Sequence, residues 1–411
     1  MQILAYLISP LHCIAAVAAA KALHGDAPVR ITCAVHWPGA DAERTAELCA
    51  IFRRMTAEMP EVDACLAVEG DALAAIVGRP DAAAAAAEMR ALCGAAAYDE
   101  IYYAHDVVGE FYRALAQAYP QARRVCYGDG MGIVYEREHH LSFLSRKTAA
   151  QAAPGGGYRA SWRRIAKRLL GRGRPRGGGD AGQPVGPPSF GRAPPPHHAA
   201  LILPVDQSGR FLRDVPLTVV PRGVARAVLD RAVAGCTALQ EHVEALLAAS
   251  GNRQRYLLLT ENSAEGGFID FDREVAMYCA VVRAVCPLGS AVILKSHPGE
   301  TLPRNEALRA NLGGDYEVMA FDPRFKRYPI ELAARLVGAC VPICMSYPAL
   351  SLKYLYDVDV IQPMDDAFIE RWFPERVWDS FKNAVTLYER PLARLAGWDR
   401  KSLLWSGAWE P

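Results

Sequence analysis

Residues 124–132 read Arg-Val-Cys-Tyr-Gly-Asp-Gly-Met-Gly, a strand-like run that ends in an acid between two glycines. Residues 290–298 read Ser-Ala-Val-Ile-Leu-Lys-Ser-His-Pro, a second apolar strand that ends in a histidine before proline. In open α/β sheets, ligands bind at the carboxyl ends of the strands. An acid and a histidine at such ends, in separate halves, predict a two-walled enzyme site. Asp129 would act there as a base, and His297 would meet an anionic leaving group.

Apolar strand-like runs and helical runs alternate along both halves of the chain. In the first half, strands are expected at residues 3–8, 29–36, 100–103 and 125–127. In the second half, strands are expected at residues 256–259, 290–294, 316–320, 339–344 and 358–362. Helices are expected at about residues 10–23, 48–55, 82–92, 110–118, 223–249, 274–285, 329–337 and 351–356. This alternation is typical of parallel sheets with crossover helices. The predicted fold class is α/β, with two Rossmann-like domains facing a central cleft.

A segment rich in glycine, proline and arginine interrupts this alternation. The whole chain has a formal charge of +1, but residues 145–199 contain eleven Lys and Arg against one acid, Asp180. Glycine and proline runs between residues 154 and 196 cannot build a core, so a disordered basic insert is expected over 148–199. Its apolar residues with helical spacing are Trp162, Ile165, Ala166, Leu169 and Leu170. This pattern is typical of a helix on an anionic membrane surface, and equally of a solvated basic loop.

The length of 411 residues exceeds the usual size of one core, so two domains are expected. The predicted organisation is an N-terminal domain over 1–147, the insert over 148–199, the completion of that domain and a connection over 200–250, a second domain over 251–390, and a tail that packs back over 391–411.

Composition and charge narrow the class of protein. Hydrophobic residues make up 51% of the chain and charged residues 22%, as in a globular protein, and the low net charge gives no preference for nucleic acid. Eleven cysteines without a CxxC pair predict buried thiols in a reduced compartment, with Cys33, Cys126 and Cys344 in the core. The N-terminus lacks a basic leader, and no run of about 18 apolar residues follows. A cytoplasmic protein, peripheral at the inner membrane, is expected.

Several residues of the second half suit a phosphate. Lys295 lies two positions before His297 and would point to the same side of the strand. Pro298 fixes the exit of the strand and holds the imidazole in place. Ser346 ends an apolar strand and Ser351 lies near a helix start, where hydroxyls either bind a phosphate or cap the helix.

The loop after the first strand of this half carries three further polar residues. Thr260, Asn262 and Ser263 either hold a nucleotide or cap the next helix. Asp129 and His297 can also be interpreted as parts of ordinary turns, because Asp-Gly and His-Pro pairs are common in structural turns.

The first half would supply the acceptor wall. Gly128 and Gly130 leave the carboxylate between them uncovered, and His12 and His105 follow other predicted strands. No metal or cofactor is expected. The pairs Asp270/Asp272 and Asp357/Asp359 are interpreted as turns, and the adjacent histidine pairs at 139–140 and 197–198 lack metal-ligand spacing.

These motifs resemble the bacterial sialyltransferases of GT-B fold, especially the α-2,8-polysialyltransferase-like group. The resemblance rests on residues 127–130 (Tyr-Gly-Asp-Gly), 133–136 (Ile-Val-Tyr-Glu), 295–298 (Lys-Ser-His-Pro) and 345–346 (Met-Ser). It extends to residues 8–12 and 203–209, and so spans most of the chain outside the insert. Two positions depart from the family pattern: Gly128 replaces the first acid, and Tyr347 follows Ser346 where a second hydroxyl is usual.

The resemblance implies an inverting, metal-independent transfer of sialic acid or a related nonulosonic acid. The donor would be a CMP-sugar, and the acceptor a cell-surface glycan or glycolipid of capsule or lipopolysaccharide type. By this likeness Asp129 is the general base, while His297 and Ser346 engage the CMP phosphate. Three alternatives stay open: a Kdo transferase, a polyol-phosphate polymerase of teichoic-acid type, and a catalytically silent protein that binds a glycan or a membrane.

Overall fold

The computed structural model describes residues 1–36, 42–104, 110–128, 194–203, 214–346, 348–382 and 385. Three residues predicted for the acceptor wall, His105, Asp129 and Gly130, lie outside these ranges. So do the C-terminal tail and almost all of the basic insert. The disorder of the insert, its membrane-binding helix and the cleft shared by Asp129 and His297 therefore stay predictions.

The first domain is built on a parallel sheet of seven strands in the order β3-β2-β1-β4-β5-β6-β7. The strands are β1 (Gln2–Leu7), β2 (Arg30–Val35), β3 (Val62–Ala67), β4 (Glu100–Ala104), β5 (Arg123–Gly128), β6 (His198–Leu201) and β7 (Leu217–Val219). The order 3-2-1-4-5-6 is that of Rossmann folds. Strands β2 and β3 are added on one side of β1, and strands β4 to β7 on its other side. The switch point of this domain therefore lies between β1 and β4.

Helices pack against this sheet: α1 (Pro10–His24), α2 (Ala42–Met55), α3 (Gly70–Val77), α4 (Ala82–Leu92), α5 (Glu110–Ala118) and α9 (Arg222–Gly235). Helix α1 starts at the carboxyl end of β1, where Ser9 caps it by accepting a hydrogen bond from the His12 amide. Its alanine-rich run 13–20 is at most 1% exposed and contacts β5, β6 and α9. Small side chains allow this close approach, so α1 fixes the carboxyl end of the first sheet.

The second domain contains a parallel sheet of four strands in the order β10-β9-β8-β11. Its strands are β8 (Arg255–Leu259), β9 (Ala291–Lys295), β10 (Glu317–Ala320) and β11 (Val341–Ile343). Its helices are α11 (Phe271–Val285), α12 (Arg304–Leu312), α13 (Ala334–Ala339), α14 (Pro348–Tyr356) and α15 (Asp366–Trp372), with short 3₁₀ turns η1 (Pro323–Phe325), η2 (Ile330–Leu332) and η3 (Glu375–Val377). Counted from β8, this is again the order 3-2-1-4, with its switch point between β8 and β11.

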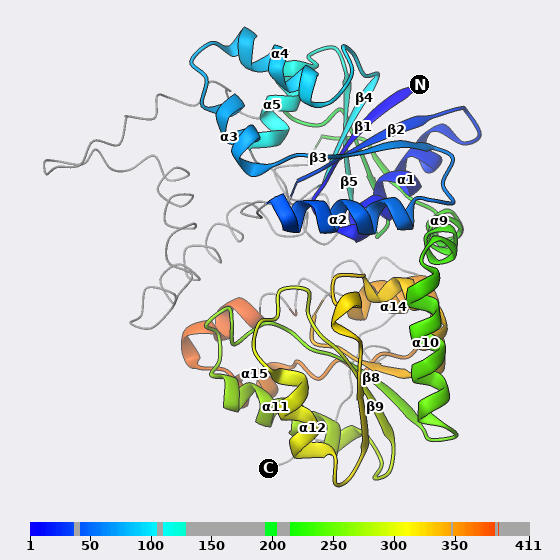
Figure 1. Cartoon of the computed structure of the whole chain (residues 1–411). Helices are drawn as coiled ribbons and strands as arrows, with labels where there is room; N and C mark the ends of the chain where they lie inside the picture. Colours follow the sequence, from blue (N-terminus) through cyan, green and yellow to red (C-terminus); the bar gives the residue numbers. More distant parts are fainter. Residues whose placement is uncertain are drawn as a thin grey trace, which may run out of the picture.

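Helices α9 and α10 (Thr237–Ser250) lead from the first domain to the second on one side of the molecule (Figure 1). Helix α9 packs on α1 and α2 of the first domain and on η2 and α14 of the second. Across the two domains, Arg54 donates to the Tyr328 hydroxyl at 2.9 Å and Arg327 pairs with Glu47 at 2.6 Å. One hydrophobic cluster includes buried residues of both domains, so the domains are packed together and not merely linked.

The structure confirms the predicted α/β fold with two Rossmann-like domains and corrects several elements. Strands β3, β6 and β7 and helices α3, α12 and α15 were not predicted; β3 is half-exposed along its length, so its apolar signal is weak. The predicted helix over 223–249 is interrupted at Cys236, whose φ of −104° and ψ of 52° are not helical. The strand predicted at 358–362 was wrong, because only an isolated bridge from Ile361 to Ile343 forms there.

The cysteines behave as the sequence predicts. All eleven are free thiols, and ten are buried, including Cys33, Cys126 and Cys344. Within the described ranges, no helix combines the length and the apolar character needed to cross a bilayer.

Candidate functional site

Most polar residues predicted in the second domain gather at one edge of its sheet. Thr260, Asn262 and Ser263 follow β8, and Ser346 follows β11, so these four flank the switch point. Lys295 ends the neighbouring strand β9, and His297 and Pro298 follow it. Ligands of open α/β sheets bind outside the strand ends at such a point. The topology therefore brings these residues into one candidate site.

His297 is held in a tight turn. The Glu300 amide donates to the His297 carbonyl at 3.0 Å, and the Gly299 amide donates to His297 Nδ1 at 3.0 Å. Pro298 lies exposed at the tip of the turn. A Cβ atom at Gly299 would lie 2.9 Å from Asn262 Nδ2 and 3.2 Å from His297 Nδ1. A side chain at this position would require the Asn262 amide group to move, because the turn after β9 meets the loop after β8.

The hydrogen bonding of His297 determines which nitrogen can serve a ligand. Burial, and next the positive charge of Lys295, lower the pKa of the imidazole to about 4, so the ring is neutral at pH 7. Because Nδ1 accepts the Gly299 amide, the ring proton lies on Nε2. Within the described part of the chain, no group bonds Nε2. This N–H group is therefore an oriented donor for an anion.

Lys295 lies beneath the turn. Its ammonium donates to the carbonyls of Ser296 at 3.2 Å and Lys326 at 2.7 Å. Burial lowers its pKa to about 8, with Glu331 and Glu300 opposing the shift. Lys326 in turn donates to the Glu300 carbonyl. Lys295 thus ties the end of β9 to the segment after β10, and its positive charge lies close to His297.

The two predicted serines take different positions. Ser346 lies at the end of β11 beside Glu261, a residue that the sequence analysis did not single out. Burial raises the pKa of Glu261, while Ser346 and Arg304 oppose that rise. Ser351, within α14, donates to Glu331 at 2.5 Å and to the Pro348 carbonyl at 3.2 Å. These bonds keep the Ser351 hydroxyl in the interior, so the structure does not bring it to the His297 turn.

A group of charged residues below the turn was also missed. Glu300 accepts hydrogen bonds from the Thr260 hydroxyl at 3.0 Å, from the Ser296 hydroxyl at 3.0 Å and from Arg304 at 2.5 Å. Arg304 is fully buried and also pairs with Glu265 and Glu274. The sequence signal was present: two charged residues, Glu300 and Arg304, follow a buried strand within ten positions, and a charge at such a place needs a buried partner.

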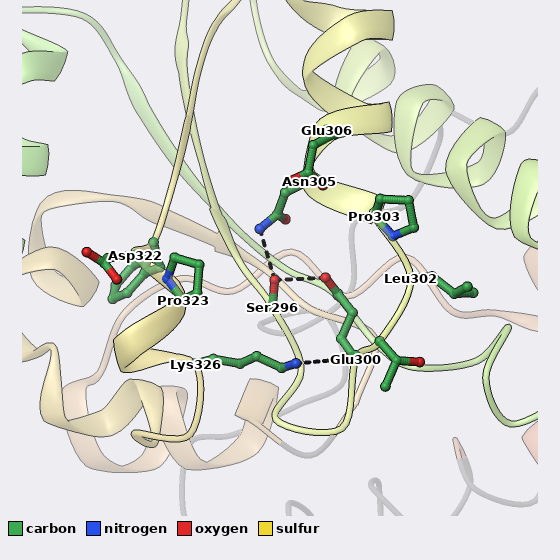
Figure 2. Close-up of a pocket in the computed structure, with 11 residues that line it drawn as sticks. Ser296, Glu300, Leu302, Pro303, Asn305, Glu306, Asp322, Pro323 and Lys326 are labelled. Carbon is green, nitrogen blue, oxygen red and sulfur yellow. Dashed lines mark hydrogen bonds between the residues drawn. The ribbon is translucent and has the colours of Figure 1, made fainter.

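A pocket of about 270 Å³ opens beside this turn, between α12 and the segment after β10. Figure 2 shows Asn305, Ser296 and Glu300 linked by hydrogen bonds along the wall, with Lys326 extending towards Glu300. The lining residues are Ser296, Glu300, Thr301, Leu302, Pro303, Asn305, Glu306, Phe321, Asp322, Pro323 and Lys326. Three carboxylates make this surface acidic, although Glu300 already accepts from Thr260, Ser296 and Arg304 and Asp322 already accepts from Arg324. It suits a neutral ligand with several hydrogen-bond donors, such as a nucleoside, better than a phosphate.

The first domain presents a different edge. His12, in the first turn of α1, is buried and its ring lies 5.9 Å from the ring of Tyr127 at an edge-to-face angle. Tyr127 donates to the Tyr6 carbonyl at 2.6 Å, and Gly128 ends β5 with a φ of +151°, a region that glycine favours. His12 and Gly128 therefore share the edge from which the chain continues to Asp129.

The aspartate pairs set aside from the sequence are found in structural positions. Asp357 and Asp359 approach the Lys353 ammonium at 3.5 and 3.4 Å, and Asp357 has a φ of +56°. Asp270 and Asp272 flank the start of α11. Within the described ranges, no group of three or more His, Cys, Asp or Glu side chains is arranged to hold a metal ion.

The sequence matches no protein-family model, and no curated protein matches it. Several solved structures are similar in fold. A UDP-GlcNAc 2-epimerase from Neisseria meningitidis, bound to UDP-GlcNAc, is 10% identical with a TM-score of 0.47, covering 94% of this chain and 91% of that chain. The GT-B domain of a sialyltransferase from Photobacterium damselae is 10% identical with a TM-score of 0.38, covering 99% and 100%. The heptosyltransferase WaaC of E. coli with ADP is 12% identical with a TM-score of 0.34, covering 89% and 88%. Likenesses at this level assign no role to any residue.

Proposed function

We propose that the protein is an inverting, metal-independent glycosyltransferase. It would move sialic acid or a related nonulosonic acid from a CMP-sugar donor to a hydroxyl of a glycan or glycolipid acceptor. The observation that carries the proposal is the state of His297: a neutral imidazole at a strand end, with an oriented Nε2–H and a nucleoside-sized pocket beside it.

The donor would bind to the second domain in two parts. Its nucleoside occupies the acidic pocket, where the acceptors of Glu300, Glu306 and Asp322 meet the base amine and the ribose hydroxyls. Its phosphate lies on the other side of Ser296, against His297 Nε2–H and the loop that carries Asn262 and Ser263. This arrangement keeps the phosphate away from the three carboxylates, which would repel it.

Leaving-group stabilisation would be the main chemical task of this domain. Positive charge develops at the anomeric carbon of a nonulosonic acid while negative charge grows on the departing phosphate. An oriented N–H donor in a partly buried site stabilises that negative charge without reorganisation. The nearby Lys295 ammonium adds a positive potential, even though its own hydrogen bonds go to backbone carbonyls.

The first domain would bind the acceptor and supply the base. Asp129 follows Gly128 at the end of β5 and takes the proton of the attacking hydroxyl. Closure of the two domains would then place Asp129 and His297 on opposite sides of the reacting carbon. The basic insert would hold the enzyme near a lipid-linked acceptor at an anionic membrane surface.

The test is to incubate the purified protein with CMP-sialic acid, CMP-Kdo and candidate acceptors, and to follow both CMP release and product mass. Acceptor-dependent release of CMP from CMP-sialic acid with a matching mass increase is the expected result. Transfer of Kdo would identify a Kdo transferase, and a parallel incubation with a nucleotide-activated polyol phosphate would identify the polyol-phosphate polymerase. The absence of CMP binding, measured by calorimetry, would leave the catalytically silent binding protein.

A further inference from the structure

The turn that carries His297 is linked to its surroundings by a buried arginine, Arg304, which does not contact His297 itself. Within the turn, His297 is held only by the amides of Gly299 and Glu300. Those two bonds fix the shape of the turn but not its place relative to the loop after β8. That place is set by longer contacts, and the side-chain contacts to the loop after β8 that run through Glu265 and Glu300 lead to Arg304.

Arg304 begins α12 and is 0% exposed. Its guanidinium donates to Glu300 at 2.5 Å, to Glu265 at 2.8 Å and to Glu274 at 2.6 and 3.1 Å. The carboxylates lie on three different segments: the turn after β9, the loop after β8 and helix α11. A planar fork with several donors in fixed directions can hold all three, which a lysine cannot do.

Each of these carboxylates also holds a part of the candidate site. Glu300 bonds the hydroxyls of Thr260 and Ser296. Glu265 accepts the amides of Thr301 at 2.9 Å and Leu302 at 3.2 Å, just beyond the turn. Arg304 therefore connects the two loops that would enclose the donor phosphate.

The third carboxylate extends the connection to the loop after β8. Glu274 accepts the amide of Ser263 at 3.1 Å through Oε1 and binds Arg304 through Oε2. Without the guanidinium, three buried carboxylates would face one another, and their repulsion would move the loops apart.

We propose that Arg304 is a positioning residue for His297: through Glu265, Glu274 and Glu300 it sets the separation of the loops after β8 and β9 at the value an anionic leaving group requires. The identity of that anion rests on the proposed function, whereas the positioning itself does not. Arg304 contacts neither the anion nor the sugar.

The first variant to test is Arg304→Lys, which keeps the charge but loses the fork. The Cε1–H signal of His297, assigned by its loss in His297→Gln, is followed by NMR from pH 4 to 8 without any substrate. In the wild type it should not titrate above about pH 5. In Arg304→Lys the loosened turn admits water, and titration should move towards pH 6.5. The kcat for transfer should fall about 10²-fold and KM for the donor should rise several-fold, because a misplacement of about 1 Å costs this much.

The matched control is Arg309→Lys, an exposed arginine in the last turn of the same helix. It should leave the His297 titration unchanged and the transfer rate within twofold. Glu274→Gln is a second variant for the case in which Arg304→Lys does not fold. It replaces a buried carboxyl group, and the amide can serve either Ser263 or Arg304 but not both, so kcat/KM should fall about tenfold while the protein stays folded.

The proposal is overturned if the folded variants keep the His297 titration and kcat/KM within twofold of wild type. A fall in melting temperature alone would likewise give Arg304 a purely structural role. If no CMP-sugar is a substrate, the proposed function fails, but the substrate-free titration still decides the positioning role. The two failures are therefore distinguishable.

Discussion

The carboxyl ends of the two sheets have the same strand order around their switch points but are stabilised in different ways. In the first domain the edge is packed with rings: Tyr6 meets Phe111 edge-to-face at 4.4 Å, and Phe111 lies 5.7 Å from His36. In the second domain the same place holds an ionic network around Arg304, with Lys295 and His297 above it. Topology therefore selects where a site lies, and the side chains select its chemistry.

We call the two carboxyl edges the first wall (first domain) and the second wall (second domain). The difference between them also indicates which wall would bind the charged phosphate of the donor. The described rings of the first edge carry no fixed charge, and burial lowers the pKa of the histidine among them, His36. The second wall contains buried charges whose balance sets the protonation of His297 and of Glu274. Substitutions in the first wall should therefore lower kcat more than donor affinity, whereas substitutions in the second wall should lower both.

The largest effect is expected from Asp129→Asn. The amide keeps the side-chain shape but cannot accept the acceptor proton, so kcat should fall by about 10²–10⁴-fold while donor affinity persists. Steady-state kinetics and CMP titration calorimetry separate the two quantities. Asp272→Asn, at an exposed site in the first turn of α11, is the control and should be silent. Near-normal transfer by the Asp129 variant would place the base elsewhere and remove the chemical role of the first wall.

A somewhat smaller but broader loss is expected from His297→Ala. Removing Nε2–H deprives the phosphate of a donor in the ground state and in the transition state, so both KM for the donor and kcat should suffer, with kcat lower by about 10²-fold. Steady-state kinetics measure kcat and KM, and CMP titration calorimetry measures the affinity for CMP. Unchanged CMP affinity would mean that the phosphate lies away from this turn, and would contradict the proposal that the second domain binds the phosphate at His297.

How much of this could be predicted from sequence depends on the type of signal. The apolar runs at Ile3–Leu7 and Ala291–Leu294 are continuous and wholly buried, so period and length were sufficient to place both strands. Strand β3 alternates irregularly and is half-exposed, and α12 carries too many polar residues to show an apolar face, so neither was found. The break at Cys236 follows Gly235, a residue that commonly ends helices, and a Cβ atom there would collide with the Arg54 carbonyl oxygen.

The candidate site likewise contains residues that a local pattern predicts and residues whose partners are set only by the fold. His297, Asn262 and Thr260 were predicted because each comes directly after an apolar strand, and the structure places them at one edge. Lys295 was expected to reach a phosphate, but its ammonium bonds two backbone carbonyls. The role of Arg304 could not be foreseen, because it depends on three carboxylates that are 4 to 39 residues away in sequence. A buried charge pair is a property of the folded chain.

A third test concerns the pH response of the ionic wall. Burial, assisted by Glu265, raises the pKa of Glu274 to about 7 from 4.5, even though Arg304 opposes the shift. A raised folded pKa means that the stabilising contribution is complete below pH 4.5 and is lost as pH rises through 7. Relative to Glu274→Gln, the wild type should lose up to about 3 kcal/mol between pH 5 and pH 8. Urea unfolding at both pH values measures this. Parallel pH dependence of the two proteins would show that Glu274 is already ionised at pH 5.

The smallest effect on catalysis is expected from deleting residues 154–196, which belong to neither wall in the proposal. The segment is inserted between β5 and β6, which are neighbouring parallel strands of the sheet. In the deleted form a Gly-Ser linker replaces it. Transfer to a soluble acceptor should stay within about twofold of wild type, because none of the residues proposed to bind the donor is removed.

We expect the deletion to weaken attachment of the protein to membranes. Residues 163–168 contain four Lys and Arg, and each contributes roughly 1 kcal/mol near an anionic surface at modest salt, while Trp162 and Ile165 would enter the headgroup layer. Sedimentation with anionic liposomes should fall sharply on deletion and should weaken with added salt in the intact protein. A variant with Arg163, Arg164, Lys167 and Arg168 changed to Gln tests charge without shortening the chain. Equal sedimentation of the intact, Gln-substituted and deleted forms would show that the insert is a linker without a role in membrane attachment.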